Sequence, residues 1–313
     1  MSVAGDSYQR CLSRLPPPGG GGAHQAIFGA GCYGARAGVT VEQVCADVRE
    51  HLPRGKRDVS DREIEEGVRA GFVEVAGGSA RPRRPAARVA PGTFERIVQE
   101  GHGATEADIR ARSPMPIDWP DWESSWRVLD ALYAPTELIF VGEEKQVGRI
   151  GETIRPAGEW VAVLKALGRV PWPKLGVNPL TGRVAPKKSG AGVTLRGDAC
   201  VAAHRFAVVE MDGASLSDQL AFWVAVPRLP VAAIVHSSGK SIHSWVRTDC
   251  ADAAEWRQKI EGRLFPSYLE PMGVDGACKN ASRMSRLPGH VRVDTGLVQR
   301  LLYLAPTGRA VNG

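Results

Sequence analysis

The sequence predicts an α+β fold for residues 93–313, with a small all-α helical domain in front of it. Short apolar runs at residues 137–142, 206–213 and 231–246 have the length and composition of strands. Between them lie segments with an apolar residue at every third or fourth position, which is typical of helices packed on a sheet. The succession strand, helix, hairpin, helix, strand therefore indicates a sheet with helices on one face.

The composition limits the class of protein. With 313 residues, of which 43% are hydrophobic and 24% charged, the chain can form one large or two modest domains. Its net charge of +6 favours a polyanionic partner. Six cysteines show no CxxC pair and no zinc spacing, so we expect free thiols in a reducing cytoplasm. No apolar run approaches the roughly 20 residues that cross a bilayer, so no membrane partner is expected.

The first 92 residues predict a tail, a helical domain and a linker. Residues 1–22 end in LPPPGGGG, and we expect a disordered tail. Residues 23–76 predict three short helices, two of which begin with the capping boxes Thr40/Gln43 and Ser60/Glu63. Residues 77–92 are rich in Arg, Pro and Gly, as interdomain linkers are. The helical domain could be a packing module or could bind a template or a partner.

The strand FAVVEMDG, residues 206–213, ends in two carboxylates one residue apart. Because side chains alternate across a strand, Glu210 and Asp212 are expected on the same face. Carboxylate oxygens are the ligands that Mg²⁺ or Mn²⁺ prefers. The alternative is a strand end whose acids are simply solvated.

Two later segments add further polar groups. On the second strand of the hairpin at residues 231–246, Ser241 and His243 share a face. The SSGKS turn before them lacks the first glycine of a Walker A motif and the helix that follows it, which excludes that motif. Residues 273–289 supply Asp275 and a basic cluster, for which a solvated face is the alternative. Acids, a histidine and a basic cluster are the parts of a metal-assisted nucleotidyl transfer site.

These segments, hhExD, SxH and GVDxACKNxSRxSRLPG, resemble the three motifs of the archaeo-eukaryotic primase superfamily, in the prim-pol branch of phages, plasmids and other mobile elements. The resemblance covers roughly residues 120–305. It implies a primase-type catalytic core with an RNA-recognition-like sheet half over residues 93–313. The first motif of the family is commonly DxD, whereas Glu210 is the leading acid here.

The resemblance also implies roles for single residues. It makes Glu210, Asp212 and Asp275 the catalytic carboxylates and the ligands of Mg²⁺ or Mn²⁺. The nucleotide-binding residues that it implies are Ser241, His243, Lys240, Lys279, Arg283, Arg286 and, from the preceding loop, Asn178.

The implied activity is a DNA-directed primase and polymerase, a nucleotidyltransferase that joins nucleoside triphosphates on a single-stranded DNA template. A separate replicative helicase is expected as a partner, because the chain has no ATPase motif. One alternative is a non-catalytic replication or origin-binding protein that keeps the fold. The other is a metal-dependent nuclease, although the basic SRMSRLPG segment suits a triphosphate better than a bare backbone.

Overall fold

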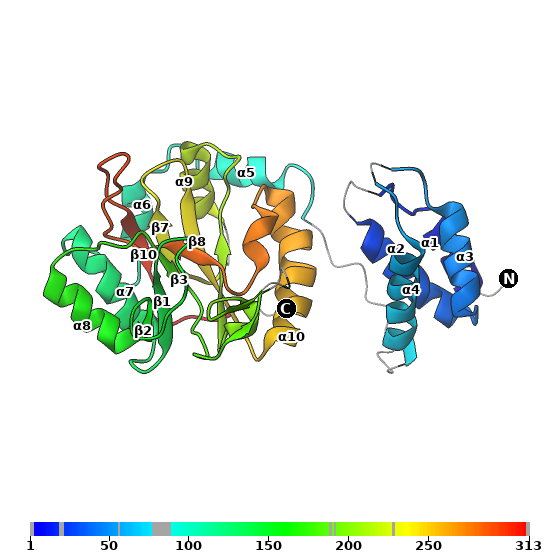
Figure 1. Ribbon diagram of the computed structural model, residues 1–313. Helices are drawn as coiled ribbons and strands as arrows, with labels where there is room; N and C mark the ends of the chain where they lie inside the picture. The colour runs from blue at the N-terminus through cyan, green and yellow to red at the C-terminus, as the bar shows by residue number, and fades with distance from the viewer. Residues whose placement is uncertain are drawn as a thin grey trace. The chain divides into compact units, whose positions relative to one another are not determined.

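The computed structural model describes residues 3–18, 22–55, 57–76, 89–187, 190, 192–226 and 229–310. The chain divides into two compact units, Met1–Arg84 and Pro85–Gly313, drawn in blue and from cyan to red in Figure 1. The division falls within the segment expected to be a linker, of which residues 77–88 lie outside the described part. Within the described part, no helix has the length and apolar character that spanning a membrane requires.

The N-terminal unit is a bundle of helices. They are α1 (Val3–Leu12), α2 (Ala23–Arg36), α3 (Val41–His51) and α4 (Asp61–Ala76). Helices α2 and α4 approach so closely that glycine is required at the contact. A Cβ atom on Gly31 would lie 2.4 Å from the Val68 carbonyl oxygen, and one on Gly71 would lie 2.5 Å from that of Phe28.

The expected disordered tail is wrong for residues 3–18. Helix α1 buries Tyr8 and Leu12 in the bundle core, and Leu15 follows them. The Tyr8 hydroxyl donates a hydrogen bond of 2.7 Å to Asp47 Oδ2 on α3. Burial of these apolar groups offsets the entropy of ordering the segment. The Pro/Gly run that suggested disorder begins only at Pro16.

The predicted capping boxes of α3 and α4 are half right. Thr40 and Ser60 accept hydrogen bonds from the backbone of Gln43 and Glu63, at 3.3 and 3.2 Å. The side chains of Gln43 and Glu63 bind Asp47 and Arg57 instead of reaching back. The start of each helix was therefore predictable, whereas the reciprocal contact was not.

In its described residues, the C-terminal unit contains two four-stranded antiparallel sheets and a short hairpin. The first sheet has the order β2-β1-β3-β9 and comprises β1 (Leu138–Gly142), β2 (Ile154–Pro156), β3 (Lys174–Gly176) and β9 (Met284–Arg286). The second sheet has the order β10-β7-β8-β6 and comprises β6 (His204–Val209), β7 (Val231–His236), β8 (Ile242–Cys250) and β10 (Arg300–Leu304). The hairpin pairs β4 (Ala185–Pro186) with β5 (Val193–Thr194).

Helices connect these strands. Before β1 lie α5 (Thr93–Glu100), α6 (Glu106–Ala111), η1 (Asp121–Glu123) and α7 (Ser124–Leu132), and later come α8 (Ala157–Leu167), η2 (Asp198–Cys200) and α9 (Leu216–Ala225). After β8, α10 (Ala253–Trp256) continues into the π-type helix η3 (Arg257–Leu269), followed by η4 (Glu270–Met272) and η5 (Gly276–Lys279). The predicted α+β class and the predicted succession from β6 to β10 are confirmed.

The second sheet is buried on both faces. Side chains such as Val209 pack with Phe222 of α9 and with Trp256 of α10. On the opposite face, Phe206 and Trp245 pack in a second core that includes α7, α8 and strands of the first sheet. Strands buried on both faces are continuous apolar runs, which explains why the sequence of β6 shows no alternation with polar residues.

Three strand contacts determine where the polar side chains meet. Val209 is paired with Ser244 in the β6–β8 ladder, so Glu210 lies beside His243. The Asp275 N–H donates to the Glu210 carbonyl oxygen at 2.9 Å. Because β9 pairs with β3, the chain after Asp275 crosses from the second sheet to the first.

Candidate functional site

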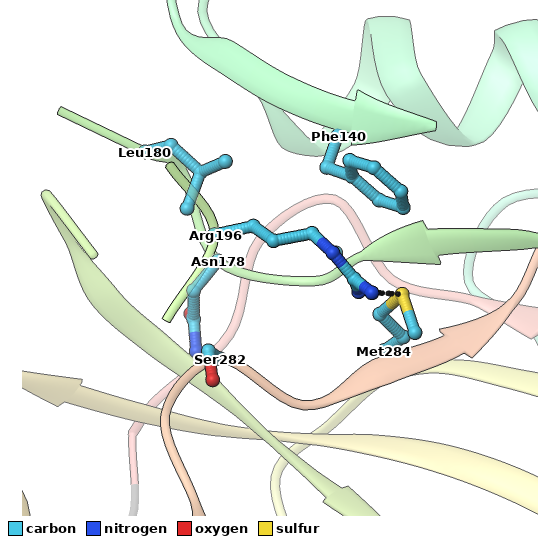
Figure 2. A pocket seen from close by; sticks show the side chains of 7 residues that line it. Phe140, Asn178, Leu180, Arg196, Ser282 and Met284 are labelled. Atoms are coloured by element: carbon cyan, nitrogen blue, oxygen red, sulfur yellow. Dashed lines mark hydrogen bonds between the residues drawn. The ribbon is translucent and has the colours of Figure 1, made fainter. Parts of the chain in front are cut away.

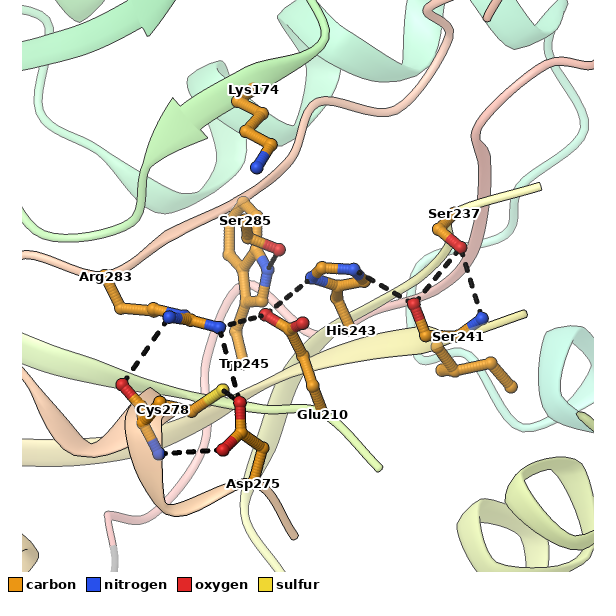
Figure 3. A network of polar contacts seen from close by, with 12 residues as sticks. Lys174, Glu210, Ser237, Ser241, His243, Trp245, Asp275, Cys278, Arg283 and Ser285 are labelled. Atoms are coloured by element: carbon orange, nitrogen blue, oxygen red, sulfur yellow. Dashed lines mark hydrogen bonds and ion pairs between the residues drawn. The ribbon is translucent and has the colours of Figure 1, made fainter. Parts of the chain in front are cut away.

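Glu210 lies one residue beyond the end of β6 and is only 8% exposed. Its Oε1 atom is 3.1 Å from His243 Nδ1 and 3.4 Å from Arg283 Nη2, as Figure 3 shows. Burial opposes ionisation of Glu210, but His243 and Arg283 outweigh it and lower the pKa of the carboxyl to about 2. The side chain is therefore an ionised acceptor at neutral pH.

His243, on β8, is the buried neighbour of Glu210. Burial lowers the pKa of its imidazole, although the neighbouring Glu210 carboxylate acts in the opposite direction. Nδ1 lies at ion-pair distance from Glu210 without hydrogen-bond geometry. Nε2 lies 3.5 Å from Ser241 Oγ, which is in turn 3.3 Å from Ser237 Oγ. Ser241 and His243 thus form a polar chain that ends at Glu210 (Figure 3).

Asp275 is the N-cap of η5, where its Oδ1 accepts the Ala277 N–H at 2.9 Å. Its Oδ2 lies 3.9 Å from Arg283 Nη2, the same nitrogen that contacts Glu210. Arg283 also donates to the Ala277 carbonyl oxygen at 3.5 Å. Arg283 is therefore a cation that both carboxylates share.

A pocket of about 290 Å³ opens beside these groups. Four cations line it, Lys174, Arg196, Arg283 and Arg286, together with the carboxylates Glu144 and Glu210. Lys174 pairs with Glu144 at 2.6 Å. Arg286 makes no ion pair with a described residue, and its buried Nε has no partner. A surplus of guanidinium and ammonium groups suits a ligand with several phosphate oxygens.

The strand predicted over residues 206–213 ends before Asp212. Strand β6 ends at Val209, and the chain turns through Met211–Ala214, with the Ala214 N–H bound to the Met211 carbonyl oxygen at 3.1 Å. Strand alternation therefore no longer applies at Asp212. Its side chain is exposed and has no hydrogen bond or ion pair with the residues described. In the described ranges, no three His, Cys, Asp or Glu residues cluster as a metal site would.

Four expected nucleotide contacts lie outside the pocket lining, namely Ser241, Lys240, Lys279 and Asn178. Lys240 is exposed at the turn between β7 and β8, and Lys279 pairs with Glu270 at 3.6 Å. Asn178 is buried, and its Nδ2 donates to the carbonyl oxygens of Phe206 and Ala281. Its Oδ1 accepts the N–H groups of Arg205 and Phe206. The Asn178 amide is thus fully used inside the protein, which disfavours a contact with nucleotide.

Sequence reasoning missed Glu144, Lys174 and Arg196, which belong to none of the three motifs. Lys174 reaches the pocket because β3 pairs with β9, where it lies opposite Arg286. Such pairing joins segments more than 100 residues apart and leaves no local pattern in the sequence. The loop that contains Lys174 is rich in Gly, Pro and Lys, and that composition was the one available signal.

The donor chemistry of the site fits a divalent cation. Glu210 and Asp275 offer hard carboxylate oxygens, and Glu210 is ionised at neutral pH. Their backbones are hydrogen-bonded to each other, and one arginine already contacts both side chains. The place between the two carboxylates is therefore favourable for positive charge.

Comparison with known proteins gives one structural likeness. No protein family model matches the chain, and no curated protein matches it. Among solved structures, the chain is similar to the AEP domain of the primase-polymerase of cyanophage S-2L, with 21% sequence identity and a TM-score of 0.41. The match covers 61% of this chain and 94% of that domain.

Proposed function

We propose that the C-terminal unit is a metal-dependent nucleotidyltransferase, a DNA primase-polymerase of a mobile element that makes primers from nucleoside triphosphates on single-stranded DNA. The observation that carries the proposal is the buried, ionised Glu210 beside Asp275 at the edge of a pocket lined by four cations. The resemblance of the three sequence motifs to those of prim-pols supports the same assignment.

In this proposal Arg283 and Arg286 bind the phosphates of the incoming nucleotide. Glu210 and Asp275, with Asp212 as the third carboxylate, would hold Mg²⁺ or Mn²⁺. When bound, such an ion assists the attacking hydroxyl and stabilises the leaving pyrophosphate. His243 is a positioning residue, because it contacts Glu210 while Ser241 holds its other nitrogen. Unwinding would come from a separate helicase.

Two observations favour a second candidate, a non-catalytic DNA-binding protein that keeps this fold. Asp212 is exposed and lacks contacts with the described part of the site. Arg283 already neutralises charge between Glu210 and Asp275. An origin-binding or replication protein would need the basic surface but not the three carboxylates.

Primer synthesis separates the two candidates. The assay uses circular single-stranded DNA, labelled ribo- or deoxyribonucleotides and Mg²⁺ or Mn²⁺. Wild type should make short products, and Asp275→Asn, which keeps the N-cap oxygen, should reduce synthesis by more than the roughly 10–100-fold typical of residues that only support a metal ligand. Asp130→Asn, on the exposed side of α7, is the matched control. DNA binding without any synthesis by the wild-type protein would establish the second candidate.

A further inference from the structure

Arg196 lines the pocket beside Glu210 and comes from a segment between β5 and η2 that the three motifs do not include. It also lines a small neighbouring pocket, where Figure 2 shows its side chain between Phe140 and Met284. Its guanidinium carbon lies 4.8 Å from the centre of the Phe140 ring. One terminal nitrogen donates to Met284 Sδ at 3.1 Å, and the other donates to the backbone carbonyl oxygen of Glu144. A ring, a thioether and a carbonyl fix the position of the guanidinium without neutralising its charge.

The charge of Arg196 is not balanced at short range. Among the described residues, no carboxylate oxygen lies within 4.0 Å of it. The side chain is partly buried, and burial lowers the pKa of its guanidinium. A guanidinium also carries more N–H donors than these two contacts use. A partly buried cation of this kind is stabilised by any anion that enters the pocket.

Glu144 is the acid nearest to this part of the pocket. Its carboxylate pairs with Lys174 Nζ, whose side chain is 18% exposed, whereas that of Glu144 is 69% exposed. Lys174 lies opposite Arg286, which lines the same pocket and, like Arg196, makes no ion pair with a described residue. Glu144 therefore sits at the solvent side of the cations, where it can leave without creating a buried unpaired carboxylate.

We propose that Arg196 and Lys174 form a second phosphate-binding pair, on the first-sheet side of the pocket, and that Glu144 competes with the bound anion for Lys174. A polyphosphate chain would then lie between Arg283 and the first-sheet cations, which are this pair and Arg286. The identity of the ligand as a nucleoside triphosphate rests on the proposed function, whereas the binding of polyphosphate does not.

Isothermal titration calorimetry with inorganic tripolyphosphate and with ATP, without metal and at low ionic strength, tests this proposal. Arg196→Met should weaken binding of both ligands about tenfold, the effect of losing one charge-assisted contact. Glu144→Gln should tighten binding roughly threefold or more, because Lys174 loses its competitor. The control is Arg149→Met. Arg149 is exposed, lies with Glu144 in the loop between β1 and β2 and does not line the pocket, so this variant should bind both ligands as wild type does.

Each outcome bears on one claim. Wild-type affinity in Arg196→Met, or weaker binding in Glu144→Gln, would overturn this proposal and leave the polymerase assignment intact. Two results together would separate the proposals: Arg196→Met loses binding, and the wild-type protein makes no primers. They would support phosphate binding by Arg196 and Lys174 and overturn the polymerase assignment. If Arg196→Met does not fold, Arg196→Lys replaces it, because lysine keeps the charge without the planar guanidinium. Arg196→Lys should bind tripolyphosphate and ATP more weakly than wild type. Unchanged affinity would contradict the proposed phosphate-binding pair.

Discussion

The two sides of the pocket differ in how completely their polar groups are paired. On the second-sheet side, Glu210 contacts His243 and Arg283, and Asp275 is a helix cap. On the first-sheet side, Arg196 and Arg286 have no carboxylate partner among the described residues. Lys174 pairs with the carboxylate of Glu144, which is largely exposed. Because an unpaired buried charge is costly, the pairing on the second-sheet side favours stability of the fold, whereas the unpaired cations on the first-sheet side favour binding of an anion from outside.

Replacement of Glu210 should have the largest effect on activity. Glu210→Gln keeps the size of the side chain but removes the charge that Arg283 and a metal ion require. We expect primer synthesis to fall roughly 1,000-fold, which is about 4 kcal/mol of transition-state stabilisation. Product formation is measured beside Glu152→Gln, an exposed acid paired with Arg149, which should retain activity. Near-normal synthesis in Glu210→Gln would remove Glu210 from the chemistry.

Replacement of Asn178 should have the largest effect on stability. Asn178→Ala removes four hydrogen bonds of 2.9 Å each, three of them buried, and leaves backbone groups of Arg205, Phe206 and Ala281 without these partners. The free energy of unfolding, measured by urea denaturation, should fall by about 3 kcal/mol. If stability is unchanged while ATP binding weakens, Asn178 is a nucleotide contact after all.

Glu106, which lies outside the pocket lining, is also a carboxylate paired with a histidine and an arginine, and the pH dependence of stability tests this pairing. Its Oε1 lies 2.6 Å from His236 Nδ1 and 2.7 Å from Arg300 Nη2. Burial opposes ionisation of Glu106, but His236 and Arg300 outweigh it and hold its pKa below the ordinary value. Glu106 therefore binds a proton more weakly in the folded state than in the unfolded state. Its ionised form stabilises the fold above the unfolded-state pKa of about 4.3, and this stabilisation is lost as the pH falls through the lower pKa of the folded state.

Glu106→Gln should accordingly lower the free energy of unfolding by about 2 kcal/mol at pH 7. The difference from wild type should shrink as the pH is lowered below about 4.3. Glu159→Gln, an exposed acid of α8, should differ from wild type at neither pH. A difference that stays constant down to pH 3 would contradict a role for the ionised carboxylate.

The sequence predicted those parts of the molecule that depend on local pattern. The β7–β8 hairpin and the helix after β6 follow from apolar spacing, and Glu210, His243 and Asp275 do lie together. The strand was predicted to reach Asp212 and ends earlier, because the end of a strand depends on the turn that follows it. Arg196 and Lys174 were missed because pairing of β3 with β9 and the stacking on Phe140 are contacts between distant segments. Local pattern and the family motifs therefore located Glu210 and Asp275, whereas Glu144 and half of the four cations could be found only from the tertiary structure.

Arg286 gives the smallest expected change in stability and the sharpest contrast between the two sides. Its burial lowers the pKa of the guanidinium, and its Nε has no hydrogen-bond partner among the described residues, so the native state gains little from the charge. Arg286→Met should therefore change the free energy of unfolding by less than about 0.5 kcal/mol, while tripolyphosphate binding weakens about tenfold. Urea denaturation and calorimetry on the same preparation measure both quantities. A large loss of stability with normal binding would show that this arginine supports the fold, and the contrast between paired and unpaired sides would then no longer hold.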